Sequence, residues 1–310
     1  MGKNHVRVLQ NSSNHVLVGI YDSQDSATYG INENLRLSAL SEILEVEPDY
    51  VVVATPTDTH FDLTCTLLEM GLNVLVEKPL ASNEKQSTKM LELMQHHGVI
   101  GAVGHIERFN SASIRAREMI KDGTIGSIIS ISTIRQSPTP VRIVDAGVIL
   151  DLLTHDIDLV QWLCDSSYKW TEVIGKKELI SEKESLVFAI AELFSGILIN
   201  HNVNWLSPFK ERKIQIIGSE GVLEINTLTS TLKHFKSAHQ SISDPSIARI
   251  LGISIGEVIE VAFNKKEALE EEHEQMLKAI SCLPNEISTF SEGCGVVKVA
   301  ESMTKKLMRS

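Results

Sequence analysis

One stretch of the sequence places an acid and an imidazole one helical turn apart. In Gly147-Val148-Ile149-Leu150-Asp151-Leu152-Leu153-Thr154-His155-Asp156, Asp151 and His155 stand in a largely apolar run. Residues i and i+4 share a face of an α-helix, so the two side chains should project together. An imidazole titrates near neutral pH and can take a hydroxyl proton, and a nearby carboxylate can orient it or bind a second hydroxyl. The pair predicts a proton acceptor; a helix-surface ion pair is the alternative. No third ligand accompanies it, so we predict no metal.

Two further motifs end predicted strands. Glu77-Lys78-Pro79 follows Asn73 to Val76, and a lysine there can hydrogen-bond a substrate hydroxyl and favour its alkoxide. Ala54-Thr55-Pro56-Thr57-Asp58-Thr59-His60 follows Tyr50 to Ala54, where threonine hydroxyls and a helix N-terminus can meet a cofactor. The alternatives are a surface lysine before a turn proline, and simple helix capping by Thr57 or Asp58.

A third motif, Gly104-His105-Ile106-Glu107-Arg108-Phe109-Asn110, closes the first half of the chain. Arg108 can pair with a phosphate or carboxylate, or form an ion pair between domains. We expect Arg108 and Asn110 to contact substrate, with the ion pair as the alternative.

The elements that must position these residues follow a βαβ rhythm up to about residue 110. Strands are expected at Val16 to Tyr21, Tyr50 to Ala54, Asn73 to Val76 and Val99 to Val103. Helical spacing covers Leu35 to Val46, His60 to Met70 and a segment from Ser82, as its cap, to His97. The rhythm predicts a doubly wound parallel sheet, a dinucleotide-binding domain over residues 1–110.

The pattern changes in residues 111–310. Long β-rich segments follow one another at Ser127 to Arg135, Leu186 to Ala191, Gly196 to Val203, Lys213 to Ile217 and Val222 to Ile225. Gly218-Ser219-Glu220-Gly221 is typical of a hairpin turn. Helices are expected at Val148 to Cys164, 266–280 and 291–308. We predict an α+β domain with a largely antiparallel sheet, used for substrate binding and oligomerisation, with C-terminal helices able to pack back on the first domain.

The N-terminus resembles the second half of a phosphate-binding turn. Gly2 precedes a predicted helix from Lys3 to Leu9, and Asp22 follows the next predicted strand, 20 residues after Gly2. A carboxylate at that spacing accepts both ribose hydroxyls and repels a 2′-phosphate, which favours NAD over NADP. Asp-Ser after a strand is also a common turn, which is the alternative.

Composition narrows the function classes. The net charge of −11 argues against nucleic acids and anionic membranes as partners. Four cysteines without a CxxC pair favour reduced thiols and a cytoplasmic location, and we see no signal peptide and no apolar run long enough to span a bilayer.

These motifs, in this order, resemble the Gfo/Idh/MocA family of NAD(P)-dependent sugar oxidoreductases over essentially the whole chain. The resemblance implies that Lys78 and His155 are catalytic, with His155 the proton acceptor and Asp151 a catalytic and substrate-binding partner. It implies cofactor contacts from Gly2, Asp22, Ala54, Thr55, Pro56, His60, Glu77 and Lys78, a sugar or nucleotide-sugar substrate, and a homodimer or homotetramer.

A narrower likeness is to the UDP-N-acetylglucosamine 3-dehydrogenases of that family, carried by residues 104–110, His155-Asp156-Ile157-Asp158 and Asn204-Trp205-Leu206-Ser207-Pro208. An inositol or another free sugar is the alternative substrate.

The sequence departs from the family at its start, where the first strand and two turn glycines are absent. That strand is central, so its absence should leave a gap of about 9–10 Å between its neighbours. We expect Met1 to be an internal methionine of a chain roughly a dozen residues longer. A degenerate relative that binds a sugar or a protein partner without redox chemistry is the alternative function.

Overall fold

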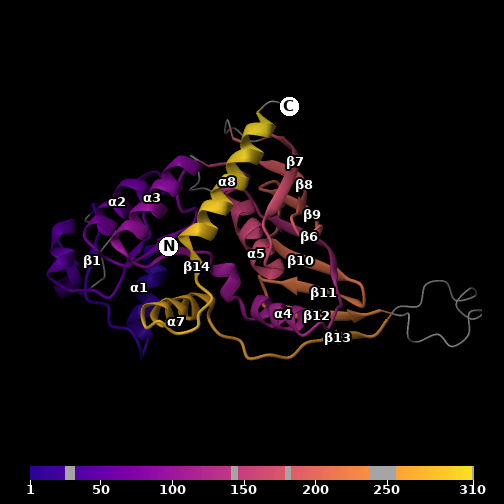
Figure 1. Cartoon of the computed structure of the whole chain (residues 1–310), viewed down its shortest axis with the longest axis horizontal. Helices are drawn as coiled ribbons and strands as arrows, with labels where there is room; N and C mark the ends of the chain where they lie inside the picture. Colours follow the sequence, from indigo (N-terminus) through magenta and orange to yellow (C-terminus); the bar gives the residue numbers. More distant parts are fainter. Residues whose placement is uncertain (25–31, 141–145, 179–182, 238–255, 309–310) are drawn as a thin grey trace, which may run out of the picture. The chain divides into compact units, whose positions relative to one another are not determined.

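The computed structural model describes residues 1–24, 32–140, 146–178, 183–237 and 256–308 (Figure 1). It divides into two compact units. The first comprises Met1–Gly104 and Leu269–Cys294, and the second comprises His105–Ala268 and Gly295–Ser310.

The first unit contains a four-stranded sheet in the order β14-β5-β4-β3. The strands β3 (Val51–Val53), β4 (Val74–Glu77) and β5 (Gly101–Gly104) are parallel, and β14 (Ser288–Thr289) adds an antiparallel edge. All four residues of β4 are buried, because the strand lies between two neighbours with both faces covered. This arrangement confirms the predicted parallel sheet.

Helices alternate with these strands. They are α2 (Thr57–Glu69) and α3 (Glu84–His97), which contact each other. The side chain of Asn83, rather than Ser82, caps α3 by accepting the backbone N–H of Gln86. Gly98 ends that helix at φ 66°, a left-handed conformation that glycine adopts without steric cost.

The segment before β3 differs from its prediction. Only β1 (Ile20–Tyr21) is a strand, and it pairs in parallel with β2 (Arg36–Leu37). Within the described residues β1 pairs only with β2, and β3 only with β4. Val16 and Val18 are 85% and 40% exposed, so the prediction of a strand buried on both faces was wrong. In the described part of the chain, no strand pairs with the side of this segment away from β2.

The helix predicted from Leu35 to Val46 is also absent. Short 3₁₀ turns occupy Glu33–Leu35 and Leu40–Leu44 on either side of β2. The Glu42 carboxylate accepts the backbone N–H of Ser38, which holds the chain in a turn. Strand pairing with β1 therefore overrides the local helical spacing.

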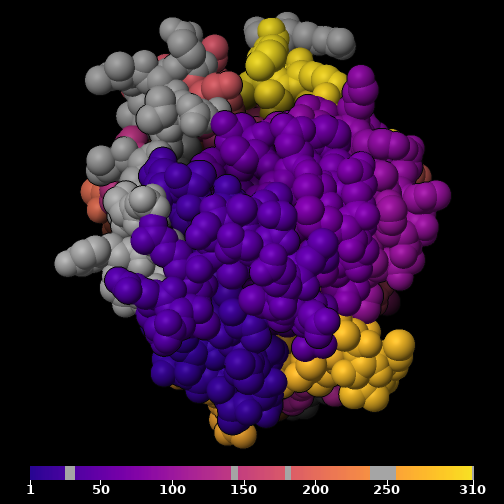
Figure 2. Space-filling model, turned by 90° about the vertical axis from the view of Figure 1, so that its left-hand side faces the viewer, coloured from indigo at the N-terminus to yellow at the C-terminus, as the bar shows by residue number. Residues whose placement is uncertain are grey.

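Two helices distant in sequence meet in the first unit. They are α1 (Gly2–Asn11) and α7 (Ala268–Ile280). His5 of α1 and His273 of α7 are in hydrogen-bond contact, and in Figure 2 the orange-yellow α7 lies beside the indigo N-terminal residues.

The second unit is built on an eight-stranded sheet in the order β13-β12-β11-β10-β6-β9-β8-β7. Every neighbouring pair is antiparallel except β6–β9, which confirms the predicted sheet type. The strands are β6 (Ile128–Gln136), β7 (Tyr168–Lys176), β8 (Leu186–Leu193), β9 (Leu198–Asn204), β10 (Glu211–Gly218), β11 (Gly221–Asn226), β12 (Thr231–Lys236) and β13 (Val258–Glu260). The strands β10 and β11 form the predicted hairpin.

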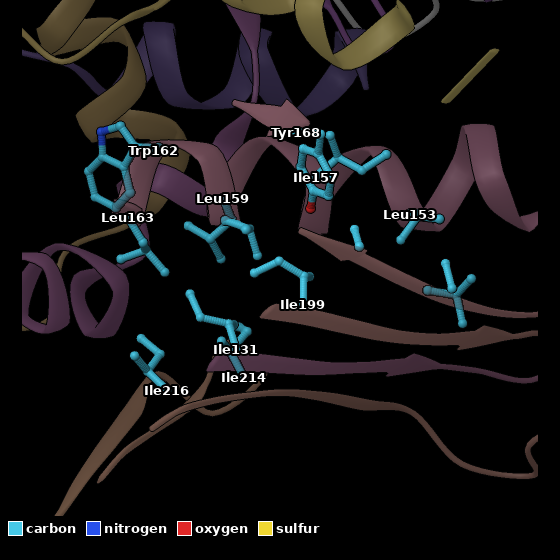
Figure 3. Packing of buried hydrophobic residues seen from close by; sticks show 14 of the residues in the cluster. Ile131, Leu153, Ile157, Leu159, Trp162, Leu163, Tyr168, Ile199, Ile214 and Ile216 are labelled. Carbon is cyan, nitrogen blue, oxygen red and sulfur yellow. The ribbon is translucent and has the colours of Figure 1, made fainter. Parts of the chain in front are cut away.

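The core of this unit lies between one face of the sheet and α5 (Thr154–Cys164). Figure 3 shows Ile157 and Leu159 of the helix near Ile131, Ile199 and Ile214 of the strands. Strand residues alternate between buried and exposed, which is the period of two that a sheet covered on one face requires. The helix α4 (Ser111–Lys121) contacts β11 and β12. The last helix, α8 (Phe290–Leu307), begins in the first unit and continues in the second.

Candidate active site

The β4 strand delivers Glu77 and Lys78 to its carboxyl end. Glu77 is 7% exposed, and its Oε1 lies 2.8 Å from His5 Nε2, while Oε2 accepts the backbone N–H of Lys78 at 3.3 Å. Burial alone would raise the pKa of Glu77, but the hydrogen bond with His5 and the positive charges of His5 and Lys78 outweigh it, so the pKa lies below its usual value. Glu77 is thus an ionised, enclosed carboxylate, and Lys78 beside it is half-buried.

The β3 strand leads into α2 through Ala54, Thr55 and Pro56. Pro56 occupies the N-cap position of α2 and no side chain caps the helix, so the alternative of capping by Thr57 or Asp58 was wrong. The first N–H groups of a helix without a side-chain cap can bind the phosphates of a dinucleotide. Thr55 is exposed at this turn. The described residues therefore fit a cofactor at the end of β3.

His60 connects the two strand-end turns. Its ring is 1% exposed, with Nδ1 2.9 Å from the carbonyl oxygen of Pro79 and Nε2 3.0 Å from that of Thr55. These contacts hold the turn after β3 against the turn after β4. His60 is therefore placed to position the backbone of both turns.

The N-terminal candidates lie at the ends of α1 and β1. Gly2 is the first residue of α1, and Asp22 is exposed directly after β1. The Asp22 carboxylate accepts the backbone N–H of Gln24 at 2.8 Å, which is the turn contact of the alternative interpretation. An exposed carboxylate that accepts one hydrogen bond from the described residues keeps lone pairs for ribose hydroxyls.

The segment that carries Asp151 and His155 is not one continuous α-helix. Ile149–Leu153 forms a π-helical turn and α5 begins at Thr154, so Asp151 lies in the π turn and His155 in the first turn of α5. Both side chains are half-buried. Single π turns occur frequently at functional sites, where they shift side chains relative to α-helical spacing.

Glu184 holds the start of this π turn. Its Oε1 accepts the backbone N–H of Ile149 at 3.1 Å, and its backbone oxygen accepts that of Val148 at 3.1 Å. A Cβ at Gly147 would stand 2.1 Å from the Glu184 carboxylate, so the close approach requires glycine. Glu184 was not among the sequence-based candidates, because it lies more than 30 residues from the helix start in sequence.

Arg108 forms a buried ion pair with Asp158. Arg108 Nε and Nη2 lie 2.8 and 2.6 Å from the two Asp158 oxygens, and His105 Nδ1 lies 2.8 Å from the same carboxylate. Burial opposes ionisation of Asp158, but Arg108 and His105 outweigh it and hold its pKa well below the usual range. This geometry supports the ion-pair alternative for Arg108, with a partner in its own unit.

Asp156, next to His155, joins a second buried cluster. Arg135 donates to Asp156 Oδ1 at 2.9 Å and to Glu107 Oε1 at 2.9 Å, and Arg212 lies 3.3 Å from Glu107. Burial raises the pKa of Asp156, and the positive charge of Arg135 offsets this increase only in part. Two cations outweigh burial at Glu107 and lower its pKa. Both clusters join the 105–109 segment to the helix of His155.

Asn110 caps α4 and braces a neighbouring loop. Its Oδ1 accepts the backbone N–H of Ala112 at 3.0 Å and the Ser230 hydroxyl at 3.1 Å, and its Nδ2 donates to the Thr227 carbonyl at 2.9 Å. These three hydrogen bonds occupy the amide within the second unit, as the ion pair with Asp158 occupies Arg108. Neither residue is therefore included in the proposed site.

The candidates therefore separate into two sets. Lys78, Glu77, His60 and the 54–56 turn belong to the first unit, and Asp151 and His155 to the second. The predicted convergence of Lys78 and His155 on one substrate hydroxyl stays a prediction. No group of acidic, histidine or cysteine side chains in the described ranges could hold a metal ion.

Family models match both units. Residues 1–105 match the NAD-binding Rossmann-fold model of the GFO_IDH_MocA oxidoreductase family, and residues 113–224 match a GFO/IDH/MocA C-terminal domain. This chain belongs to the Gfo/Idh/MocA family. As a member, it is an oxidoreductase with an NAD-binding Rossmann fold.

This Gfo/Idh/MocA protein is similar in sequence to sugar and inositol dehydrogenases. It is 24% identical over 267 residues to a UDP-N-acetylglucosamine 3-dehydrogenase of Acidithiobacillus ferrooxidans, with 86% of this chain and 81% of that protein covered. It is 30% identical over 203 residues to a scyllo-inositol 2-dehydrogenase (NAD(+)) of Bacillus subtilis, with 60% and 58% covered.

Solved structures agree on the fold. A structure of the Acidithiobacillus ferrooxidans enzyme has a TM-score of 0.86 at 22% identity and covers 99% of this chain and 94% of that chain. Levoglucosan dehydrogenase in complex with NADH and levoglucosan has a TM-score of 0.86 at 16% identity, with 100% and 95% covered.

Proposed function

We propose that the protein transfers a hydride between a secondary hydroxyl of a sugar or nucleotide sugar and NAD. In the oxidative direction, His155 takes the hydroxyl proton, Lys78 stabilises the alkoxide that forms, and Asp151 binds a neighbouring hydroxyl. Bound NAD would supply the hydride acceptor for the carbon that bears this hydroxyl. The proposal is supported by one contrast. Lys78, Asp151 and His155 keep partial exposure, while three other charged residues of the second unit, Asp156, Asp158 and Arg108, are at most 2% exposed.

The 3-hydroxyl of UDP-N-acetylglucosamine is the proposed substrate group. It is supported by the relative that covers most of this chain, which bears that activity in its name. The scyllo-inositol dehydrogenase is more identical but matches a smaller share of the chain, so an inositol is the second candidate.

A substrate screen tests this assignment. The full chain is incubated with NAD and either UDP-N-acetylglucosamine or scyllo-inositol, and NADH is followed at its absorbance band. We expect NADH formation with UDP-N-acetylglucosamine at a kcat/KM at least about tenfold above that with scyllo-inositol. The reverse preference would transfer the assignment to inositols, and no NADH with any sugar, together with no NAD binding, would contradict the function.

We further propose that NAD is preferred over NADP. The proposal rests on the exposed carboxylate of Asp22, which directly follows β1. A carboxylate there accepts two ribose hydroxyls and repels a 2′-phosphate.

We propose that a second copy of the chain packs against the exposed face of the sheet in the second unit. Strands β7, β8 and β9 expose Ile174, Phe188, Ile190 and Leu198, between 43% and 67% each. Ile174 and Phe188 stand directly opposite each other across β7 and β8. In a twofold interface the same patch of both copies meets, so apolar side chains would cover apolar side chains, and exposed apolar patches mark interaction surfaces.

We propose a cytoplasmic location. Cys65, Cys164, Cys282 and Cys294 are all free thiols, which suits a reducing compartment. None of the helices in the described ranges has the length and apolar character needed to cross a bilayer.

A further inference from the structure

A buried chain of ionisable side chains runs through the first unit and ends at Glu77. His5 Nε2 lies 2.8 Å from Glu77 Oε1, and His5 Nδ1 lies 3.1 Å from His273 Nε2. The hydroxyl of Tyr50 lies 2.8 Å from His273 Nδ1. The chain joins four elements: the end of β4, α1, α7 and the residue before β3. His5 and His273 are 3% and 1% exposed, so both rings are buried.

The chain is satisfied at every nitrogen in two arrangements. When His5 carries a proton only on Nε2, it donates to Glu77, His273 Nε2–H donates to His5, and the Tyr50 hydroxyl donates to His273. When His5 carries both protons, it donates to Glu77 and to His273, and His273 Nδ1–H donates to the Tyr50 oxygen. In both, His5 donates to the Glu77 carboxylate and His273 is neutral.

The charge states agree with that scheme. Burial, with the charges of His5 and His15, lowers the pKa of His273 to about 3, so the ring stays neutral. Burial, followed by Glu272, Glu274 and Asp49, raises the pKa of Tyr50, so the phenol stays protonated.

The chain reaches Lys78 through the second oxygen of Glu77. Oε2 accepts the Lys78 backbone N–H at 3.3 Å, so the carboxylate is held by His5 on one oxygen and by Lys78 on the other. A Cβ at Gly104 would lie 3.3 Å from this carboxylate, so the glycine on the neighbouring strand leaves the room that Glu77 occupies. A rotation of Glu77 would therefore remove the acceptor of the Lys78 backbone N–H.

We propose that His5 and His273, with Tyr50 at the far end, are positioning residues that orient Glu77 and, through it, Lys78. The part that concerns turnover rests on the proposed function. Stability alone does not require such a chain, because apolar side chains of similar volume commonly match or exceed the stability of buried ionic groups. A continuous path of polar contacts to one backbone amide points instead to control of that amide.

The first test reads the chain without activity. Histidine ring nitrogens are labelled with ¹⁵N, and long-range ¹H–¹⁵N spectra are compared for wild type, Glu77→Gln and Tyr50→Phe. We expect Glu77→Gln to shift the ring signals of His273, two members away, and Tyr50→Phe to shift those of His5. Exposed His97 on α3 is the internal control and should keep its signals. Ring signals of His273 that are unchanged in Glu77→Gln would show that the connected side chains are not coupled, which would overturn the proposal.

The second test reads the position of Lys78. The backbone amide signal of Lys78 is followed in His5→Leu, His273→Leu and the matched control His97→Leu. Shifts in the first two that exceed the control are expected, and shifts no larger than the control would overturn the positioning role. If His5→Leu does not fold, His5→Gln and Tyr50→Phe, which keep more of the packing, take its place.

The third test is a double-mutant cycle on turnover. His5→Leu should lower kcat about tenfold with the KM for NAD changed less than about threefold, and should add nothing further in a Glu77→Gln background. Additive losses would show that His5 acts by another route. If the wild-type chain oxidises no sugar, the proposed function fails while the two spectroscopic tests still decide the chain.

Discussion

At the scale of single residues, the catalytic candidates are more exposed to solvent than the buried, ion-paired residues that support them. Asp156 and Asp158 are 1% and 0% exposed and are held by arginines, while His155 between Thr154 and Asp156 is half-buried. A buried, paired carboxylate cannot bind a substrate hydroxyl without losing its cation. His155 is therefore the one partly exposed side chain between Thr154 and Asp158.

The role of His155 leads to a first prediction. His155→Ala should lower kcat by at least about 100-fold, because a positioned general base contributes roughly 10²–10⁴ in rate. The Kd for NAD, measured by nicotinamide fluorescence, should change less than about threefold, because the base acts on the substrate proton. His97→Ala is the control on an exposed histidine. Wild-type turnover in His155→Ala would remove His155 from the mechanism.

The carboxylate of Asp22 carries a second prediction at this scale. Asp22→Ala should weaken NAD binding about tenfold and narrow the preference for NAD over NADP, because the ribose hydroxyls lose an acceptor and a 2′-phosphate loses its repulsion. Titrations of both cofactors measure the ratio of Kd values. A ratio unaltered from wild type would leave Asp22 with only the turn contact to Gln24.

At the scale of elements, buried ion pairs connect the 105–109 segment to α5. Arg135 is the centre of one cluster, since its guanidinium contacts both Asp156 and Glu107. The nearby carboxylates outweigh the effect of burial and raise the pKa of Arg135 above its usual value, so it stays charged. The π turn before α5 has its own support in Glu184. The position of His155 thus depends on contacts from several strands and loops.

Removal of this cation should be costly. Arg135→Met should lower the free energy of unfolding of the second unit by about 3–5 kcal/mol, because Asp156 and Glu107 stay buried without their shared partner. Arg115→Met, which removes an exposed i,i+3 pair with Glu118, should cost less than about 1 kcal/mol. Urea unfolding followed by circular dichroism compares the two variants. Equal, small losses would show that the cluster contributes little.

At the scale of the whole molecule, each unit contains a histidine kept neutral by burial. Burial lowers the pKa of His201 to about 3, and its ring lies between Thr133 and Tyr168 at 2.7 Å on each side. His273 in the first unit has its pKa lowered to about 3 as well. Both rings have an ordinary pKa of 6.5 when the chain unfolds.

This pair predicts acid sensitivity. Between pH 6.5 and 3 the unfolded chain binds protons that the folded chain does not, so the free energy of unfolding falls as the pH falls. Each histidine should remove about 2 kcal/mol between pH 7 and pH 5. His201→Gln should flatten this dependence by about that amount in urea unfolding at the two pH values. An unchanged slope would mean that His201 titrates near its ordinary pKa.

The proposed oligomer belongs to the same scale. Ile190→Lys on the exposed face of β8 should shift the protein to a smaller species in sedimentation velocity, because a charge would be buried at the interface. Lys121→Glu, on α4 and away from that sheet face, is the control. A monomeric wild type, or an oligomer insensitive to Ile190→Lys, would contradict the proposed interface.

Much of the architecture followed from local patterns. The apolar runs around β3, β4 and β5 and the β-rich segments that became β8 to β11 predicted strands, because β-branched and apolar residues favour strands. The combination of Glu77-Lys78-Pro79 with Asp151 and His155 pointed to the family, which the family models confirm. The predictions that failed, the 35–46 helix and the buried strand at Val16 to Tyr21, depended on neighbours that local spacing does not encode.

The sequence by itself determined the periodicity of most elements and the parallel and antiparallel classes of the two larger sheets. It also supplied the candidates for proton transfer. Only the tertiary structure decided which partners the polar side chains have: Arg108 pairs with Asp158, Glu184 supports the π turn, and His5 lies between Glu77 and His273. The physical reason is range. The periodicity of a helix or strand depends on residues that are near in sequence. The partner of a buried ionisable group, which helps to set its charge state, can come from a segment as far as 268 positions away.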